Sequence, residues 1–312
     1  MSRLRTGASA LVVSLALVYV LWGSTYLAIR IAIEGLPPLM LSAIRNLVAG
    51  GILFSWMRWR GAPWPTLRQW RNGTLIGFMM MSIGNGFVCL AERHVPTGLA
   101  ALVVGSAPVF AILFGWGFGM RPRALEWAGV LLGFAGVAML NLDLRAAASP
   151  GAIALLLIAT ASWSFATILQ PRLDMPKGGA SAGVQMLGGG ACLTLMSALQ
   201  GESLPAHVPG RSWLALAYLV VFGSLIAFSA FIYVIQHARP ALATSYAYVN
   251  PVVAVGLGAL FADESITWPL LAAMGVILAA VVMVMLANQR KPAAPAPAPA
   301  KPASQPCEAA RS

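Results

Sequence analysis

The second half of this chain repeats residues of the first half at a nearly constant separation. One such separation pairs Trp22 with Trp163. Five apolar segments fit into one period, and because five is odd, the second copy must cross a membrane in the opposite direction. The sequence therefore predicts inverted repeats, which many secondary transporters build around one central site. A slightly longer separation, shared by most of the repeated residues, joins His94 with His237, Leu99 with Leu242, Pro108 with Pro251, and Gly115 with Gly258.

The low content of charged residues indicates that lipid, rather than water, is the solvent. Of the 312 residues, 59% are hydrophobic and 9% are charged, whereas soluble proteins carry about 25% charged residues. The net charge of +11 lies in short loops between apolar runs, which argues against a nucleic-acid surface. Cys89, Cys192 and Cys307 lack the spacing of a disulfide or metal site. We expect no metal and no cofactor.

Ten apolar segments approach the roughly 20 residues that a transmembrane helix needs. The sequence therefore predicts an all-α polytopic membrane protein of ten transmembrane helices. We expect a five-helix repeat over 1–145, an inverted one over 146–289 and a disordered Ala/Pro-rich tail over 290–312. The segments are 10–31, 39–57, 74–92, 97–118, 125–142, 151–170, 181–199, 213–235, 240–262 and 267–287.

The distribution of Lys and Arg predicts the orientation of the chain. With the N-terminus inside, the inner segments hold 15 of these residues and the outer segments hold only Arg93, Arg145 and Arg211. Cytoplasmic loops carry such an excess. We therefore expect both termini to be cytoplasmic.

Three segments carry a resemblance to a known family: WGSTYLAIRIAIEGLPPLMLSAIRNLVAGG at 22–51, NGFVCLAERHVPTGLAALVVGSAPVF at 85–110, and PALATSYAYVNPVVAVGLGALFADE at 240–264. They resemble the drug/metabolite transporter superfamily and, within it, the EamA family of permeases. The resemblance runs from about Leu11 to Leu286. It implies ten helices in two inverted halves, a bacterial inner (plasma) membrane location and export of small metabolites, amino acids or drugs.

Pro108 and Pro251 lie at matching positions of the repeat, each about 11 residues into its segment, or roughly 16 Å deep. A proline leaves the carbonyl four residues earlier without its helical donor. We therefore expect two kinked helices that open a cavity at the membrane midplane. Two purely structural kinks are the alternative.

Six further side chains are candidates for substrate contact: Trp22, Tyr26, Asn85, Trp163, Tyr246 and Asn250. Tyr246 and Asn250 share one helix face, while their repeat equivalents are Val103 and Ala107, so recognition would be asymmetric. The symmetric Trp22 and Trp163 are placed to sandwich an organic substrate. Core packing and hydrogen bonding between helices are the competing interpretations of all six.

Charges within the membrane are costly and mark candidate functional sites. Arg45 lies roughly 10 Å into its segment, where it would neutralise an anionic substrate or, as we favour at this stage, play a structural role. Glu92 and Glu264 lie at outer ends of segments, too shallow for an obvious midplane proton relay. The sequence thus offers little support for a buried carboxylate coupling site.

These observations predict a secondary transporter that exports small organic molecules by alternating access, not an enzyme. Its expected partners are a small-molecule substrate and the lipid bilayer, with no nucleic acid and with a homodimer left open. One alternative is a membrane-embedded enzyme on a lipid-linked substrate, which would need Glu92, His94 and Glu264 to converge. A facilitator of uptake and a non-transporting scaffold are the others.

Overall fold

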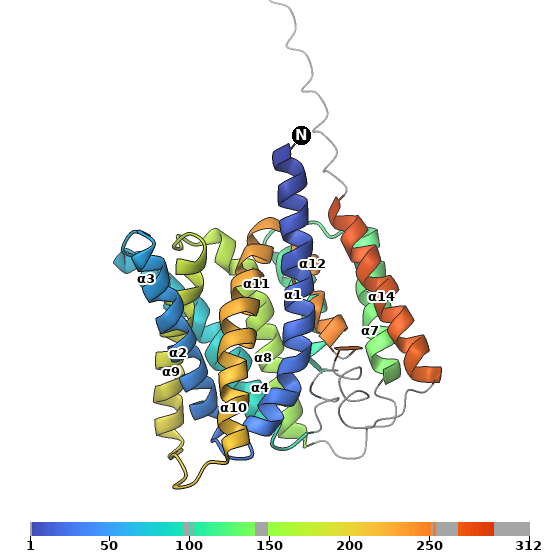
Figure 1. The fold of residues 1–312 in the computed structure, drawn as a ribbon. Coiled ribbons are helices and arrows are strands. Elements are labelled where there is room, and N and C mark those ends of the chain that lie inside the picture. The colour runs from blue at the N-terminus through green and yellow to red at the C-terminus, as the bar shows by residue number, and fades with distance from the viewer. Residues whose placement is uncertain are drawn as a thin grey trace, which may run out of the picture.

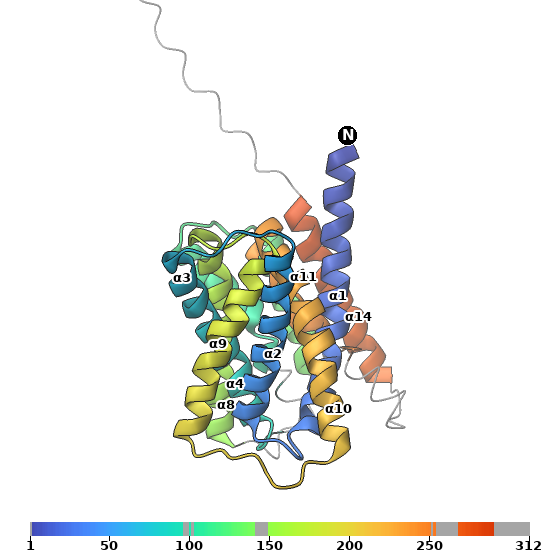
Figure 2. The same ribbon diagram turned by 60° about the vertical axis from the view of Figure 1, so that its left-hand side comes forward.

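The computed structural model describes residues 2–95, 100, 103–140, 149–250, 252–253 and 268–289. In these ranges the chain forms helices and no strands, and the long helices run side by side as one bundle (Figures 1 and 2). The helices are α1 Ser2–Ala32, α2 Pro38–Trp59, α3 Leu67–Gly77, η1 Phe78–Asn85, α4 Gly86–Ala91, α6 Ala107–Gly117, α7 Ala124–Leu140, α8 Pro150–Leu169, η3 Gln170–Arg172, α9 Gly179–Leu199, α10 Gly210–Tyr218, η4 Leu219–Ile226, α11 Ala227–His237, α12 Pro240–Ala243 and α14 Trp268–Gln289.

Six helical stretches in the described ranges are long and apolar enough to cross a membrane. Their bounds agree with the predicted segments to within a few residues, except that the third begins well before the expected position 74. Large apolar side chains such as Val20, Leu195 and Leu214 are exposed on them, as expected for surfaces that face lipid. The six are Ser9–Ala32, Pro38–Trp59, Leu67–Ala91, Pro150–Arg172, Gly179–Leu199 and Gly210–His237.

The remaining predicted segments are described only in part. Ala107–Gly117 and Ala124–Gly136 are shorter apolar helices, and α14 covers the tenth predicted segment. Residues 251 and 254–262 of the ninth segment and the whole tail 290–312 lie outside the described residues. A count of ten transmembrane helices and the division between the two halves therefore stay predictions.

Two helices contain π-helical turns at equivalent positions of the repeat. η1 lies between α3 and α4, and η4 lies between α10 and α11. The first residues of the two turns, Phe78 and Leu219, have the same separation along the chain as Trp22 and Trp163, and so do their last residues. Because π-helical turns occur frequently at functional sites, they indicate where the two halves surround a site.

The predicted fourth helix is broken rather than kinked. Gly105 and Ser106 form a turn, and α6 begins anew at Ala107 with Pro108 in its first turn. A proline in a first turn removes a donor that has no partner within the helix in any case. The expected kink at Pro108 is therefore wrong. The ninth segment is also interrupted, by a turn at Thr244 and Ser245.

Glycines allow α3 and η1 to pack closely against α9. A Cβ atom at Gly77 would overlap the carbonyl oxygen of Gln185, and one at Gly189 would lie 2.5 Å from the carbonyl oxygen of Gly77. The Ser82 hydroxyl donates to the Gly189 carbonyl at 2.9 Å. Small residues commonly permit such contact between transmembrane helices. α2 packs along the same helix α9, and α7 packs along α14 at another edge of the bundle (Figure 1).

Replacing Gly77 by alanine should destabilise the protein by about 1–3 kcal/mol, because the added methyl group forces α3 away from α9. Thermal unfolding of the purified protein in detergent measures this loss. Gly51 in α2 is the matched control, since a Cβ atom there meets nothing within 4 Å. A Gly77→Ala variant as stable as Gly51→Ala would contradict the close packing described here.

Candidate functional site

A cavity lies within the bundle, lined by residues from both halves of the chain. Its volume is about 70 Å³, measured as the space open to the centre of a water molecule, which is room for several waters. Asn85, Gly84 and Val88 come from η1 and α4, so one of the π-helical segments forms part of the wall. The lining residues are Trp22, Thr25, Tyr26, Ile29, Arg45, Gly84, Asn85, Val88, Val104, Ala107, Ala159, Thr160, Trp163, Tyr246 and Asn250.

Three aromatic rings form one continuous wall of the cavity. The Trp22 ring meets the Trp163 ring edge to face, with centroids 5.5 Å apart, and meets the Tyr246 ring at 4.7 Å. The Trp22 indole N–H donates to the carbonyl of Gly223 in η4 at 3.0 Å, which fixes its orientation. Because Trp22 and Trp163 contact each other, no ligand fits between them in this conformation. They present an aromatic wall rather than the expected sandwich.

Several polar groups in the wall lack partners. Asn250 lies near the Tyr26 hydroxyl, but among the described residues its buried amide oxygen accepts no hydrogen bond, and the buried Trp163 indole N–H has no acceptor. The amide nitrogen of Asn85 is directed only at the Met81 sulfur, 3.7 Å away. Unsatisfied buried groups are rare and costly. They would gain hydrogen bonds from a polar ligand.

Six of the eight predicted contact residues line this cavity: Trp22, Tyr26, Asn85, Trp163, Tyr246 and Asn250. Pro108 is buried in α6, and its neighbours Val104 and Ala107 line the cavity in its place. Pro251 lies outside the described residues. Sequence reasoning overlooked Thr25 and Thr160, whose hydroxyls donate to their own helices at Trp22 and Leu156. It also assigned Arg45 to a structural role, although this arginine lines the cavity.

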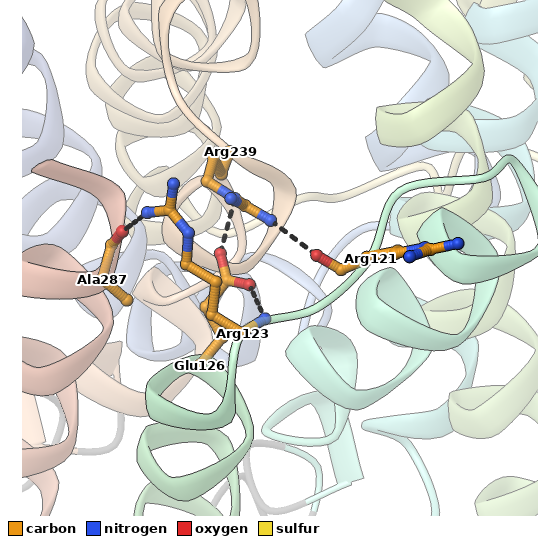
Figure 3. Close-up of polar contacts among 5 residues, drawn as sticks. All are labelled: Arg121, Arg123, Glu126, Arg239 and Ala287. Atoms are coloured by element: carbon orange, nitrogen blue, oxygen red, sulfur yellow. Dashed lines mark hydrogen bonds and ion pairs between the residues drawn. The ribbon is translucent and has the colours of Figure 1, made fainter. Parts of the chain in front are cut away.

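An ion-pair cluster joins three parts of the chain at one end of the bundle (Figure 3). The Arg239 guanidinium contacts the Glu126 carboxylate at 2.6 Å and donates to the Arg121 carbonyl at 3.2 Å. Glu126 also accepts from the Arg123 backbone N–H at 2.8 Å, and the Arg123 side chain donates to the Ala287 carbonyl. The cluster therefore ties the start of α7 to the connection before α12 and to the end of α14.

This cluster and the cavity lie at different depths of the bundle. The end of α14 that carries Ala287 lies at the same end as the N-terminus of α1 (Figures 1 and 2). The α1 residues that line the cavity, Trp22 to Ile29, belong to the other half of that helix. A second, smaller cavity is lined by Glu126 and Arg239 together with Ala111 and Gly115 of α6. The ion pair thus lies nearer the N-terminal end of α1 than the aromatic cavity does.

Glu92, which the sequence places at the outer end of its segment, is more deeply buried in the protein than that position suggests. It is the first residue after the span Leu67–Ala91, and its exposed fraction is 0%. Neither carboxyl oxygen has a hydrogen-bond partner in the described part of the chain. The Arg30 guanidinium donates instead to the backbone carbonyl of Glu92, at 3.1 Å. Burial raises the pKa of the Glu92 carboxyl to about 8, and the positive charge of Arg30 opposes part of that rise.

The described residues give no support for the convergence of Glu92, His94 and Glu264 that an enzyme site would need. His94 is exposed while Glu92 is buried, and Glu264 lies outside the described residues. No group of three or more His, Cys, Asp or Glu side chains there is placed to hold a metal ion.

Comparison with known proteins gives consistent matches over most of the chain. A family model described as the EamA-like transporter family matches residues 10–142 and again 150–286. The chain is 43% identical over 282 residues to the "Uncharacterized inner membrane transporter YedA" of Escherichia coli K12, covering 90% of this chain and 92% of the relative. It is 26% identical to "Protein PecM" of Dickeya dadantii, covering 88% and 93%. A solved crystal structure matches with a TM-score of 0.74 at 21% identity, covering 90% of this chain and 99% of that chain, and supports the fold alone.

The buried carboxyl of Glu92 should make the stability of the protein fall as the pH rises. Its pKa in the unfolded chain is near the ordinary value of 4.5, so between that value and about 8 the folded state holds a proton that the unfolded state has lost. Stability therefore decreases with pH through this window and levels off above it.

Melting temperatures measured across the same pH range test this expectation. The wild type should lose stability with rising pH, whereas Glu92→Gln, which cannot titrate, should show a flatter curve. Glu34→Gln is the control, because Glu34 is half-exposed and paired with Arg211, and it should retain the slope of the wild type. Parallel curves for the wild type and Glu92→Gln would contradict the raised pKa.

Proposed function

Because the chain belongs to the EamA-like transporter family, we propose that it is a secondary transporter that exports small organic molecules by alternating access around the aromatic cavity. The substrate would bind to Trp22, Tyr26, Asn85, Trp163, Tyr246 and Asn250. The observation that carries this proposal is the cavity itself, which is lined by both halves of the chain and walled in part by a π-helical segment.

The composition of the cavity wall supports an organic substrate. Three contacting aromatic rings offer an apolar surface, and the unpartnered groups of Trp163 and Asn250 offer hydrogen bonds that fix an orientation. Binding sites for small molecules typically combine a mainly apolar lining with a few placed polar groups. The proposal includes a change of conformation, because the present space holds only a few waters.

The Glu126–Arg239 ion pair supports alternating access. The distribution of Lys and Arg favours a cytoplasmic position for both termini, and this proposed topology assigns the ion-pair cluster to the cytoplasmic end. The pair would then be the closed inner gate, and its opening would expose the cavity to the cytoplasm. The E. coli relative is named as an inner membrane transporter, and we propose the same membrane here, with repeats over 1–145 and 146–289.

Reconstituted liposomes provide the test. The protein should mediate saturable flux of at least one solute from a panel of radiolabelled amino acids, aromatic acids and amphipathic amines. Asn250→Ala removes one unpartnered amide from the cavity and should raise the half-saturating concentration about tenfold, the effect expected for one buried hydrogen bond.

The same substitution at Asn46 is the matched control. Asn46 is a buried amide that donates within its own helix, to Ser42, and it does not line the cavity. Flux through Asn46→Ala should therefore resemble that of the wild type. Absence of protein-dependent flux across the whole panel would contradict the proposed function, and equal effects of the two substitutions would contradict the proposed site.

A further inference from the structure

Among the described residues that line the cavity, Arg45 is the one with a charged side chain. It lies seven residues after Pro38, the first residue of α2, or roughly 10 Å along the helix axis. Its exposed fraction is 5%, so the charge is held inside the protein rather than directed to the membrane surface. No Asp or Glu lines the same cavity in the described part of the chain.

The guanidinium is held in place by η4. Its Nε donates to the Ser224 hydroxyl at 2.7 Å. Gly223 permits the close approach, because a Cβ atom there would lie 2.9 Å from Nη2 of Arg45. The Gly223 carbonyl also accepts the Trp22 indole N–H. One π-helical turn therefore positions both the cation and the aromatic wall beside it.

Arg45 has no negative partner among the residues that the structure describes. The Ser224 hydroxyl is its one hydrogen-bond partner there, and both ion pairs of the described chain involve other arginines. Arginine stays protonated in proteins, and a buried charge without a counter-charge is strongly unfavourable. The remaining N–H donors of its planar fork match a carboxylate, which accepts two parallel hydrogen bonds.

We propose that the cavity binds small organic carboxylates, with the carboxylate paired to Arg45 and an aromatic or apolar body packed against Trp22, Trp163 and Tyr246. A cationic amine would meet a like charge without a compensating acid. A neutral ligand would leave the arginine uncompensated. This inference names the substrate class of the proposed transporter, and so it rests on the cavity being the site of transport.

Three probes that share an indole ring distinguish the effect of ligand charge on binding from the effect of ligand shape. They are indole-3-acetate, which is an anion, indole-3-acetamide, which is neutral and of nearly the same shape, and tryptamine, which is a cation. Calorimetric titration of the purified protein in detergent at neutral pH measures their binding without requiring transport. The wild type should bind the acid at least about tenfold more tightly than the amide and should bind tryptamine most weakly.

Variants of Arg45 test whether this residue causes the preference for the acid over the amide. Arg45→Gln should bring the ratio of acid to amide affinity close to one, and Arg45→Lys should keep part of the preference. Arg30→Gln is the matched control, because Arg30 is exposed, does not line the cavity and donates to the Glu92 carbonyl. It should keep the ratio of the wild type.

Equal binding of acid and amide by the wild type, or no measurable binding of the acid, would overturn the proposal whatever the variants do. So would an Arg45→Gln protein that still prefers the acid. The outcome is separable from that of the proposed function. Charge-selective binding without flux would refute transport alone, whereas saturable flux of neutral solutes without a preference for acids would refute the role of Arg45 alone.

Discussion

In a bilayer, a backbone polar group can be satisfied only by the protein itself, so departures from a regular helix are confined to places that protein or an internal cavity surrounds. This constraint organises the whole molecule. The π-helical turns η1 and η4 and the turn before α6 all lie at or beside the cavity, while the described spans Ser9–Ala32, Pro38–Trp59 and Gly179–Leu199 are continuous α-helices. Each of these irregular turns either lines the cavity or contacts a residue that lines it.

The two halves use equivalent turns for different tasks. η1 places Gly84 and Asn85 directly in the cavity wall. η4, its counterpart in the second half, instead holds two lining residues in place. Its Gly223 carbonyl accepts a hydrogen bond from the Trp22 indole N–H, and its Ser224 hydroxyl accepts one from the Arg45 guanidinium. The symmetry of the fold therefore gives an asymmetric site, with a single cation set beside an aromatic surface.

The sequence was sufficient to predict the features that depend on apolar segment length and on the internal repeat. Apolar length was sufficient to locate the six described spans, and the repeat was sufficient to pair Trp22 with Trp163, which meet in the cavity. It was wrong about Pro108, because a proline is equally compatible with a kink and with a new helix start. The π-helical turns have no distinct residue signature.

Groups whose role depends on packing between distant segments escaped sequence reasoning. The depth of Arg45 was clear, but its direction depends on how α2 is rotated against η4. Glu126 and Arg239 are far apart in the sequence, and nothing local to either residue predicts their ion pair. Glu92 lies at the end of its span, as the sequence indicates, but its burial comes from packing within the protein that the sequence does not show. The aromatic part of the site was thus predictable, and the charged part was not.

The central claim is that the Glu126–Arg239 pair opens and closes one end of the bundle. Electron paramagnetic resonance can measure the distance between spin labels on Ala124 of α7 and Gln236 of α11, which are exposed residues that flank the pair, after Cys89, Cys192 and Cys307 are replaced by serine. In lipid nanodiscs, we predict two distance populations, with the longer one enriched when Glu126→Gln removes the ion pair. A single distance that Glu126→Gln leaves unchanged would contradict the account.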